Sequence, residues 1–263
     1  MNATFSRFVL EPVRTIGGIV RLVEDTLRET FAHALRGRAP LRASLFFVQA
    51  DRAGVGSLPL VVMISFFMGL TMALLTGYQL RKFGTQNLVP GLVGIGFTRE
   101  LGPLMTGIMV AARIGAAYTA ELGTMTASEE VEAIDAMGIG PLRLLVAPRV
   151  LAVFLMLPCL SVAANIAALA GGALVCQQHF DISNRYFAEL VLENLIIRDI
   201  VSGILKSFLF GLIIALISCY KGLSVTGGAA GVGAATTSSV VTAITVVIAA
   251  DTLFNIIMVL IYE

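Results

Sequence analysis

Three charged side chains lie inside or beside long apolar stretches of this 263-residue chain: Glu100, Lys206 and Asp251. Hydrocarbon does not solvate charge, so such residues usually face a partner, a cavity or a transport path. Glu100 and Lys206 lie near the same end of their stretches, and their side chains could meet at similar depth. We therefore expect a polar cluster of Arg99, Glu100 and Lys206, with a purely structural ion pair as the alternative; Asp251 has no obvious partner in the sequence.

The composition predicts that these charges are held in a membrane. Hydrophobic residues make up 57% of the chain and charged residues only 13%, about half the usual share in soluble proteins. Residues 53–80, 150–180 and 222–250 carry no Asp, Glu, Lys or Arg, and each run exceeds the roughly 20 residues that a spanning helix needs. The net charge of +1 gives no indication of a nucleic-acid partner.

The pattern predicts an all-α membrane protein with an N-terminal interfacial region (1–52) and a transmembrane domain (53–263). Residues 5–35 alternate apolar and charged positions at helical spacing, which is typical of an amphipathic helix in the interface plane. Arginines before the first span favour a cytoplasmic N-terminus, and five spans then put the C-terminus outside. The five expected spans are 57–80, 99–120, 146–177, 200–220 and 238–261, with 83–98 as a broken outer connection and 178–199 as an outer helix or loop.

The most acidic stretch, 126–138, lies between spans two and three on the side predicted to be cytoplasmic. Thr126 and Glu129 have the spacing of a capping box, and Gly138 can end the helix. A short acidic helix at this place can dock in a groove of another protein; a solvated connecting helix is the alternative. Val131, Ile134 and Met137 recur at i, i+3 and i+6 and would form one apolar edge of this helix. The residues expected in the helix are Glu129, Glu130, Val131, Glu132, Ile134, Asp135 and Met137.

Other patterns exclude chemistry in the chain itself. The glycine-rich run 227–233 (GGAAGVG) is not followed by Lys-Ser or Lys-Thr, so it is not a nucleotide loop, and we expect 221–237 to form an inner turn. Three cysteines in apolar runs and two distant histidines make no metal site, and no cofactor is expected. If ATP drives this protein, another chain must bind it.

Two longer runs resemble a known family. Residues 98–149 (TRELGPLMTGIMVAARIGAAYTAELGTMTASEEVEAIDAMGIGPLRLLVAPR) and 221–241 (KGLSVTGGAAGVGAATTSSVV) are similar to the signature of the MlaE/YrbE permeases, membrane subunits of MCE-associated ABC transporters. The resemblance implies a non-enzymatic permease in the bacterial inner membrane that moves phospholipids between inner and outer membranes and maintains outer-membrane lipid asymmetry. It also implies a homodimer on two copies of a cytoplasmic ATPase, a STAS-domain protein bound to that ATPase, and a periplasmic ring of MCE-domain subunits.

The resemblance further assigns roles to residues. Segment 128–137 corresponds to the coupling helix that docks on the ATPase, and Arg99, Glu100 and Lys206 match polar positions near the phospholipid cavity. The alternative function is an ion- or proton-coupled secondary transporter that uses Glu100, Lys206 and Asp251, although the sequence lacks the inverted repeat frequent in such folds. An intramembrane enzyme would need a nucleophile with a base, or a metal cluster, and the sequence shows neither.

Overall fold

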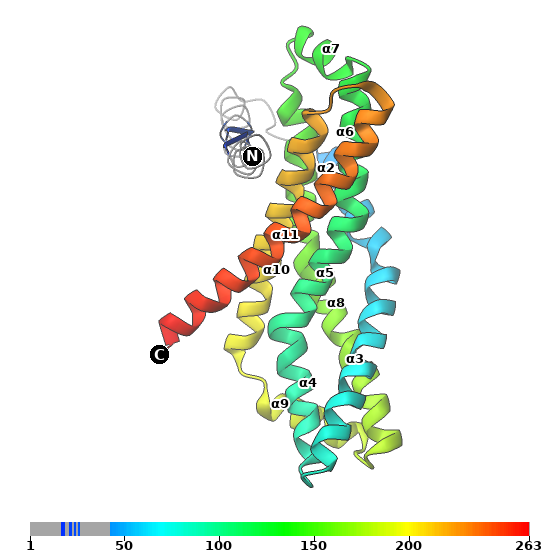
Figure 1. Ribbon diagram of the computed structural model, residues 1–263, viewed down its shortest axis with the longest axis vertical. Coiled ribbons are helices and arrows are strands. Elements are labelled where there is room, and N and C mark those ends of the chain that lie inside the picture. Colours follow the sequence, from blue (N-terminus) through cyan, green and yellow to red (C-terminus); the bar gives the residue numbers. More distant parts are fainter. Residues whose placement is uncertain (1–16, 19–20, 23, 25, 27–42, 263) are drawn as a thin grey trace, which may run out of the picture. The chain divides into compact units, whose positions relative to one another are not determined.

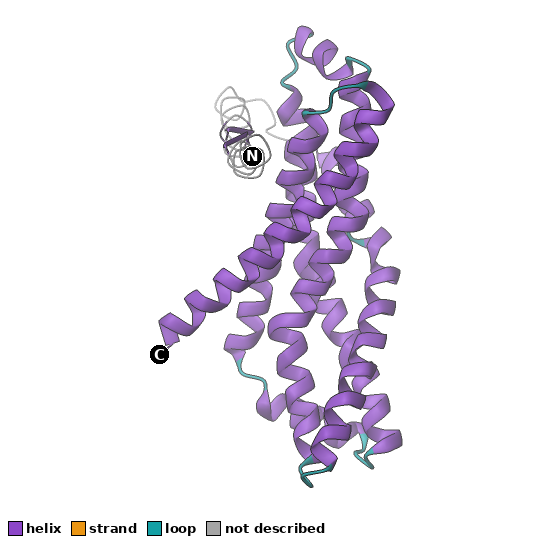
Figure 2. Ribbon diagram, in the orientation of Figure 1, coloured by secondary structure: helices purple, strands orange, loops and turns teal. Residues whose placement is uncertain are grey.

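The computed structural model describes residues 17–18, 21–22, 24, 26 and 43–262, and all regular structure in these residues is helical (Figure 1; Figure 2). Three short π-helical segments, Phe97–Leu101, Ala111–Gly115 and Leu142–Val146, continue directly into α-helices. The α-helices are α2 (Ala43–Ala53), α3 (Leu58–Arg81), α4 (Val89–Gly96), α5 (Gly102–Val110), α6 (Ala116–Ala127), α7 (Glu130–Ala136), α8 (Ala147–His179), α9 (Asn184–Asn194), α10 (Ile197–Leu223) and α11 (Gly228–Tyr262).

Five helical stretches of the described chain are long and apolar enough to cross a membrane, which confirms the predicted all-α fold with five spans. The predicted interfacial helix at 5–35 falls largely outside the described residues, and the 1–52/53–263 division stays a prediction. Segment 178–199, predicted as helix or loop, contains α9. The five stretches are Ser44–Arg81, Gln86–Ala127, Leu142–His179, Ile197–Leu223 and Gly228–Leu260.

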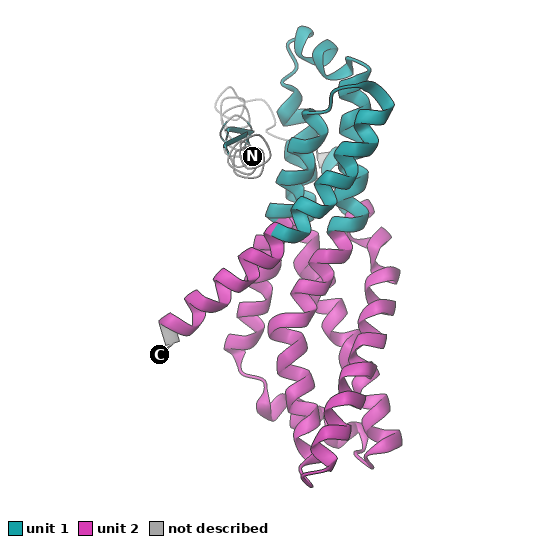
Figure 3. Cartoon of the chain, viewed as in Figure 1, with its two compact units in different colours: residues 1–50, 111–153, 212–245 teal, residues 51–110, 154–211, 246–263 magenta. Residues whose placement is uncertain are grey.

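The chain forms two compact units, coloured separately in Figure 3. Unit 1 comprises Met1–Ala50, Ala111–Val153 and Leu212–Thr245, and unit 2 comprises Asp51–Val110, Phe154–Gly211 and Val246–Glu263. Each unit is therefore assembled from three separate parts of the sequence, and each has an apolar core of its own.

The core of unit 2 is built on close contact between helices. Buried side chains of α3, α4, α8, α9 and the π-helical segment Phe97–Leu101 pack together, including Val93, Phe97 and Phe187. A Cβ at Gly69 of α3 would overlap the main chain of Ala168 in α8, so only glycine permits this approach. Small residues in membrane helices let backbones come together and gain dispersion energy where no hydrophobic driving force exists.

The core of unit 1 lies around the ends of α6, α8 and α10. Leu122, Val146 and Cys219 are completely buried there. Val131 and Ile134 of α7 are partly buried against the same cluster. The short helix α7 is thus seated on this core by its apolar edge, while its acidic side chains remain exposed.

The prediction of a broken connection at 83–98 is wrong, because a continuous helical stretch begins at Gln86. Pro90 lies in the first turn of α4, where a missing N–H costs no helical hydrogen bond. Gly91 and Gly94 face α9 closely: an added Cβ would lie 2.9 Å from Asn194 Cγ and 3.0 Å from Val191 Cγ1, respectively. The glycines that suggested a loop therefore serve helix packing, and the second span starts well before residue 99.

The prediction of an inner turn over 221–237 is wrong over most of its length. Only 224–227 lie outside the helices, and α11 already begins at Gly228. Gly227 and Gly228 have φ angles of +91° and +66°, which an L side chain adopts only with strain. Beyond them, the four alanines between 229 and 235 are strong helix formers and sustain the helix despite Gly231 and Gly233.

Candidate functional site

The centre of the candidate site is Lys206, a fully buried cation on the apolar helix α10. Its Nζ lies 2.5 Å from Glu100 Oε2, 2.9 Å from Asp251 Oδ1 and 2.7 Å from Asn255 Oδ1. An ammonium group has three N–H donors, and three oxygens surround this one. The Phe254 ring also lies 5.5 Å from Nζ. Lys206 thus donates hydrogen bonds to Glu100 and Asn255 and forms an ion pair with Asp251, which compensates its charge inside an apolar bundle.

The partners of Lys206 come from two other segments of unit 2. Glu100 stands in the π-helical segment Phe97–Leu101, whereas Asp251 and Asn255 lie one turn apart on α11. The Asn255 Nδ2 donates to Glu100 Oε2 at 3.1 Å and lies 3.5 Å from Asp251 Oδ2. Asn255 thus bridges the two acids and reduces the repulsion that two close carboxylates would otherwise feel.

A second cation extends the site toward a more accessible region. The Nε of Arg99 lies 3.5 Å from Glu100 Oε1, and its Nη1 lies 3.8 Å from Asp199 Oδ1. The side chains of Arg99 and Glu100 are about one-third exposed (34% and 33%), whereas Asp199 is buried in the first turn of α10. A carboxylate at that place is stabilised by the positive end of the helix dipole. We call Arg99, Glu100, Asp199, Lys206, Asp251 and Asn255 the charge cluster.

An apolar cavity of about 280 Å³ adjoins the same stretch of chain, lined by Leu101 and by one face of α3. Leu101 directly follows Arg99 and Glu100 in sequence. The cavity has room for hydrocarbon, and the charged side chains of Arg99 and Glu100 are not part of its lining. The α3 residues in the lining are Met68, Thr71, Met72, Leu75 and Thr76.

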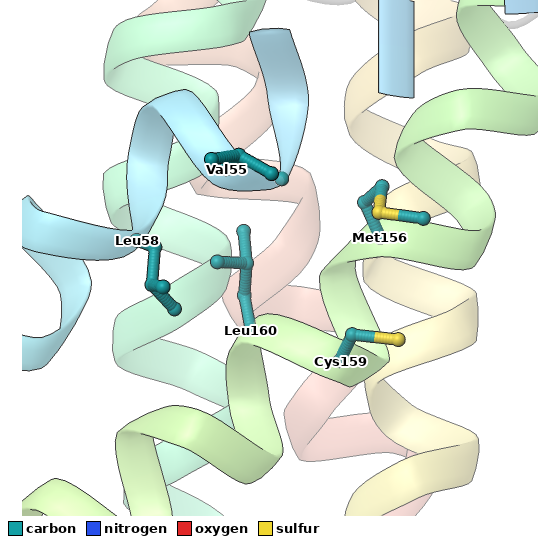
Figure 4. Close-up of a pocket in the computed structure, with 6 residues that line it drawn as sticks. Val55, Leu58, Met156, Cys159 and Leu160 are labelled. Carbon is teal, nitrogen blue, oxygen red and sulfur yellow. The ribbon is translucent and has the colours of Figure 1, made fainter. Parts of the chain in front are cut away.

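A second apolar cavity of about 180 Å³ in unit 2 offers a contrast (Figure 4). Its lining consists of Gly54, Val55, Leu58, Met156, Cys159 and Leu160, without a charged residue. The labelled side chains in Figure 4 are aliphatic or carry sulfur, so this cavity offers no group that would hold a polar head.

The structure brings Arg99, Glu100 and Lys206 together, as the sequence led us to expect, but it adds partners that the sequence did not suggest. Asp251 contacts Lys206 directly, and Asn255 and Asp199 complete the surroundings. The spacing of Asp251 and Asn255, four residues apart in an apolar helix, places both on one face and could have indicated a shared partner. No comparable signal marked Asp199, because its contact with Arg99 depends on how α10 packs.

The acidic segment forms the short helix α7, but the predicted capping box is wrong. Thr126 Oγ1 donates within α6, to the carbonyl of Leu122 at 2.8 Å, rather than capping α7. Glu129 occupies the N-cap position with a left-handed φ of 60° and no side-chain cap. Gly138, with φ +70°, follows the end of α7 as predicted. Glu130, Glu132 and Asp135 are exposed, while Met137 is exposed rather than packed with Val131 and Ile134.

The sequence matches a family model described as Permease MlaE over residues 46–257. A probable ABC transporter permease protein of Rickettsia prowazekii (strain Madrid E) is 39% identical over 204 residues, which cover 78% of this chain and 79% of the relative. A probable ABC transporter permease protein of Synechocystis sp. is 34% identical over 216 residues, 82% of this chain and 81% of the relative. The protein TRIGALACTOSYLDIACYLGLYCEROL 1, chloroplastic, of Arabidopsis thaliana is 36% identical over 217 residues, 82% of this chain and 61% of the relative.

Proposed function

Because the chain belongs to the MlaE permease family of ABC transporters, we propose that it is the membrane subunit through which such a transporter moves phospholipid between inner and outer membranes and so maintains outer-membrane lipid asymmetry. The match over residues 46–257 carries this proposal, since it includes all five spanning stretches in whole or in large part. A permease subunit is a transporter component rather than an enzyme. ATP hydrolysis belongs to a separate cytoplasmic ATPase.

A lipid cargo is supported by the name of one relative and by the local chemistry. The Arabidopsis relative is named after trigalactosyldiacylglycerol, a lipid. In this chain, Arg99 and Glu100 are partly exposed beside Leu101, which lines the 280 Å³ apolar cavity. In the proposed pathway, a lipid head group meets Arg99 and Glu100 while an acyl chain enters the cavity. The buried Lys206 fixes the position of Glu100 through their ion pair.

The short helix α7 is the proposed contact with the ATPase. Its outward side carries Glu129, Glu130, Glu132, Asp135 and Met137, and its inward side carries Val131 and Ile134. The exposed acidic side chains of α7 can bind a basic groove of the ATPase. Because Val131 and Ile134 pack on the core of unit 1, a movement of α7 would also move that core. The proposed assembly further contains a second copy of this chain, a STAS-domain protein and a periplasmic MCE-domain ring, in the bacterial inner membrane with the N-terminus inside and the C-terminus in the periplasm.

The first test is copurification. Tagged chain is expressed with its neighbouring subunits, and the double variant Glu129→Lys with Glu130→Lys is compared with the wild type. We expect the variant to insert in the membrane but to lose the ATPase. The matched control, Glu189→Lys with Glu193→Lys, reverses two exposed acids on α9 and should keep it. Retention of the ATPase by the α7 variant would contradict the docking assignment.

The second test is transport in vesicles. The complete complex should move fluorescent phospholipid only with ATP, and the chain alone should be idle. Movement driven by an ion or proton gradient, without the ATPase, would instead support a secondary transporter. The double variant Glu100→Gln with Lys206→Met, which removes both charges together, should abolish ATP-driven transport. Normal transport by this variant would show that the charges of Glu100 and Lys206 are not needed for lipid movement, and that the charge cluster is only structural.

A further inference from the structure

Unit 1 contains a second buried cation, Arg149, that the proposed lipid pathway does not use. Arg149 is only 6% exposed and lies in the first turn of α8. Its Nη2 donates to Glu121 Oε2 at 3.0 Å, and its Nη1 donates to the Leu145 carbonyl at 2.8 Å. The guanidinium carbon lies 5.5 Å from the centre of the buried Tyr118 ring. One planar group thus makes two directed hydrogen bonds and packs on an aromatic ring, which fixes its orientation.

The contacts of Arg149 with Glu121 and Tyr118 join the two helices that flank α7, whereas its hydrogen bond to Leu145 stays within one helical stretch. Glu121 and Tyr118 belong to α6, which precedes α7, whereas Arg149 and Leu145 belong to the segment that follows it. Between them, Val131 and Ile134 of α7 pack on a core that includes Leu122, Leu145 and Val146. The Arg149–Glu121 ion pair therefore joins the two ends of segment 122–148, which contains α7.

The helix α6 is in turn bound tightly to the remaining helices of unit 1. Thr119 Oγ1 lies 3.1 Å from the Ser218 carbonyl of α10 and 2.8 Å from Ser239 Oγ of α11, and all three residues are buried. A Cβ at Gly222 of α10 would lie only 2.7 Å from Leu122 Cβ, so α6 and α10 are in close contact. We therefore expect a displacement of α6 to be passed to α10 and α11 through these contacts.

We propose that Arg149 and Glu121 form a coupling clamp: positioning residues that hold α6 and α8 together beneath α7, so that force on α7 moves both helices as one body. This inference rests on the proposed docking of the ATPase on α7. Charge would not be needed merely to hold α6 and α8 together, because well-packed apolar residues often replace buried ion pairs without loss of stability. The directed fork of Arg149, which holds Glu121 and Leu145 at once, resists rotation and sliding in a way that apolar contacts do not.

The test measures lipid moved per ATP hydrolysed by the complete complex in vesicles. Glu121→Gln keeps the shape and removes the charge, and Arg149→Lys keeps the charge and removes the fork. For both variants we expect the ATPase to copurify normally and to hydrolyse ATP within about twofold of wild type, while lipid moved per ATP falls about tenfold. The control is Glu189→Gln, which breaks the exposed Arg185–Glu189 pair of α9 and should leave the ratio unchanged.

A double variant separates coupling from simple stability. Arg149→Met with Glu121→Leu should be as stable as wild type to thermal unfolding, yet should remain uncoupled. An unchanged transport ratio in Glu121→Gln and Arg149→Lys, or a double variant with normal coupling, would overturn the clamp. Failure of the unaltered complex to retain the ATPase or to move lipid would instead overturn the proposed function, and so the two failures are distinguishable.

Discussion

Lys206 and Arg149 are both cations excluded from solvent in apolar helices, but their surroundings differ. Lys206 has no exposed surface and is held by three side-chain oxygens from two other segments of unit 2. Arg149 has one carboxylate partner, a carbonyl four residues before it in the chain, and an aromatic face, all within unit 1. Lys206 therefore lies between two carboxylates, whereas the guanidinium of Arg149 is directed at one carboxylate among the described residues.

This difference indicates different uses of buried charge. The charge cluster contains two cations and three acids, and its more exposed members, Arg99 and Glu100, directly precede a residue that lines an apolar cavity. In the proposed lipid pathway, the partly exposed Arg99 and Glu100 exchange a contact with a bound head group. The Arg149–Glu121 ion pair joins two helices of unit 1, which is the geometry on which the proposed coupling clamp depends. A buried charge is therefore informative only together with the number and origin of its partners.

The largest effect is expected for Lys206→Met, which leaves Glu100 and Asp251 close together without their cation. Removing one partner of a buried ion pair costs about 3–5 kcal/mol, so the free energy of unfolding in detergent should fall by that amount. Lys221→Met is the matched control, because Lys221 is on the same helix but is not fully buried and donates a hydrogen bond to the Ser238 hydroxyl at 3.1 Å. Equal losses of unfolding free energy in the two variants would show that Lys206 contributes no more to stability than the more accessible Lys221.

A smaller loss of about 2–3 kcal/mol is expected for Arg149→Met, measured in the same unfolding assay. The carboxylate left behind, Glu121, has a side chain that is 39% exposed and can be hydrated, whereas the Asp251 side chain is only 13% exposed. A loss greater than that of Lys206→Met would reverse the comparison, since Arg149 would then contribute more to the free energy of unfolding than the fully buried Lys206.

Helix spacing offers the next test. A Cβ at Gly203 of α10 would overlap the Thr98 carbonyl and push Lys206 away from the segment that carries Glu100. Gly203→Ala should therefore lower the free energy of unfolding by about 1–2 kcal/mol. In Gly107→Ala the nearest atom, Phe210 Cδ2, is 3.5 Å from the new Cβ, so that variant should be neutral or slightly stabilising. Similar losses in both would argue against a spacing effect.

The smallest effect is expected for Glu189→Gln on α9. The Arg185–Glu189 pair measures 3.2 Å, but the two side chains are 91% and 55% exposed. Exposed pairs four residues apart contribute less than about 0.5 kcal/mol, so unfolding of this variant should match wild type within error. A clear loss here would show that ion-pair distance, rather than burial, decides the contribution in this protein.

Much of the fold could be predicted because long uncharged runs admit few structures other than spanning helices. Two errors came from glycine, and a third was the capping box predicted for Thr126 and Glu129. Gly91 and Gly94 suggested a break, and Gly231 and Gly233 suggested a turn, but these residues lie within α4 and α11. Sequence alone does not distinguish a glycine that ends a helix from one that lets another segment approach, because the difference lies in the neighbouring segment. Gly138, whose φ is +70°, was predicted correctly from its place between an acidic helix and Pro141.

The sequence by itself determined that this chain is helical and membrane-spanning, and that Glu100 and Lys206 must find partners, because the cost of charge in hydrocarbon is a property of the residue and its apolar neighbours. Only the tertiary structure decided who those partners are. Asp251 and Asn255 meet Lys206, Asp199 meets Arg99, and Glu121 meets Arg149, across sequence separations that no local pattern encodes. Side-chain hydrogen bonds reach about 3 Å, so their partners are fixed by the rotation and spacing of whole helices.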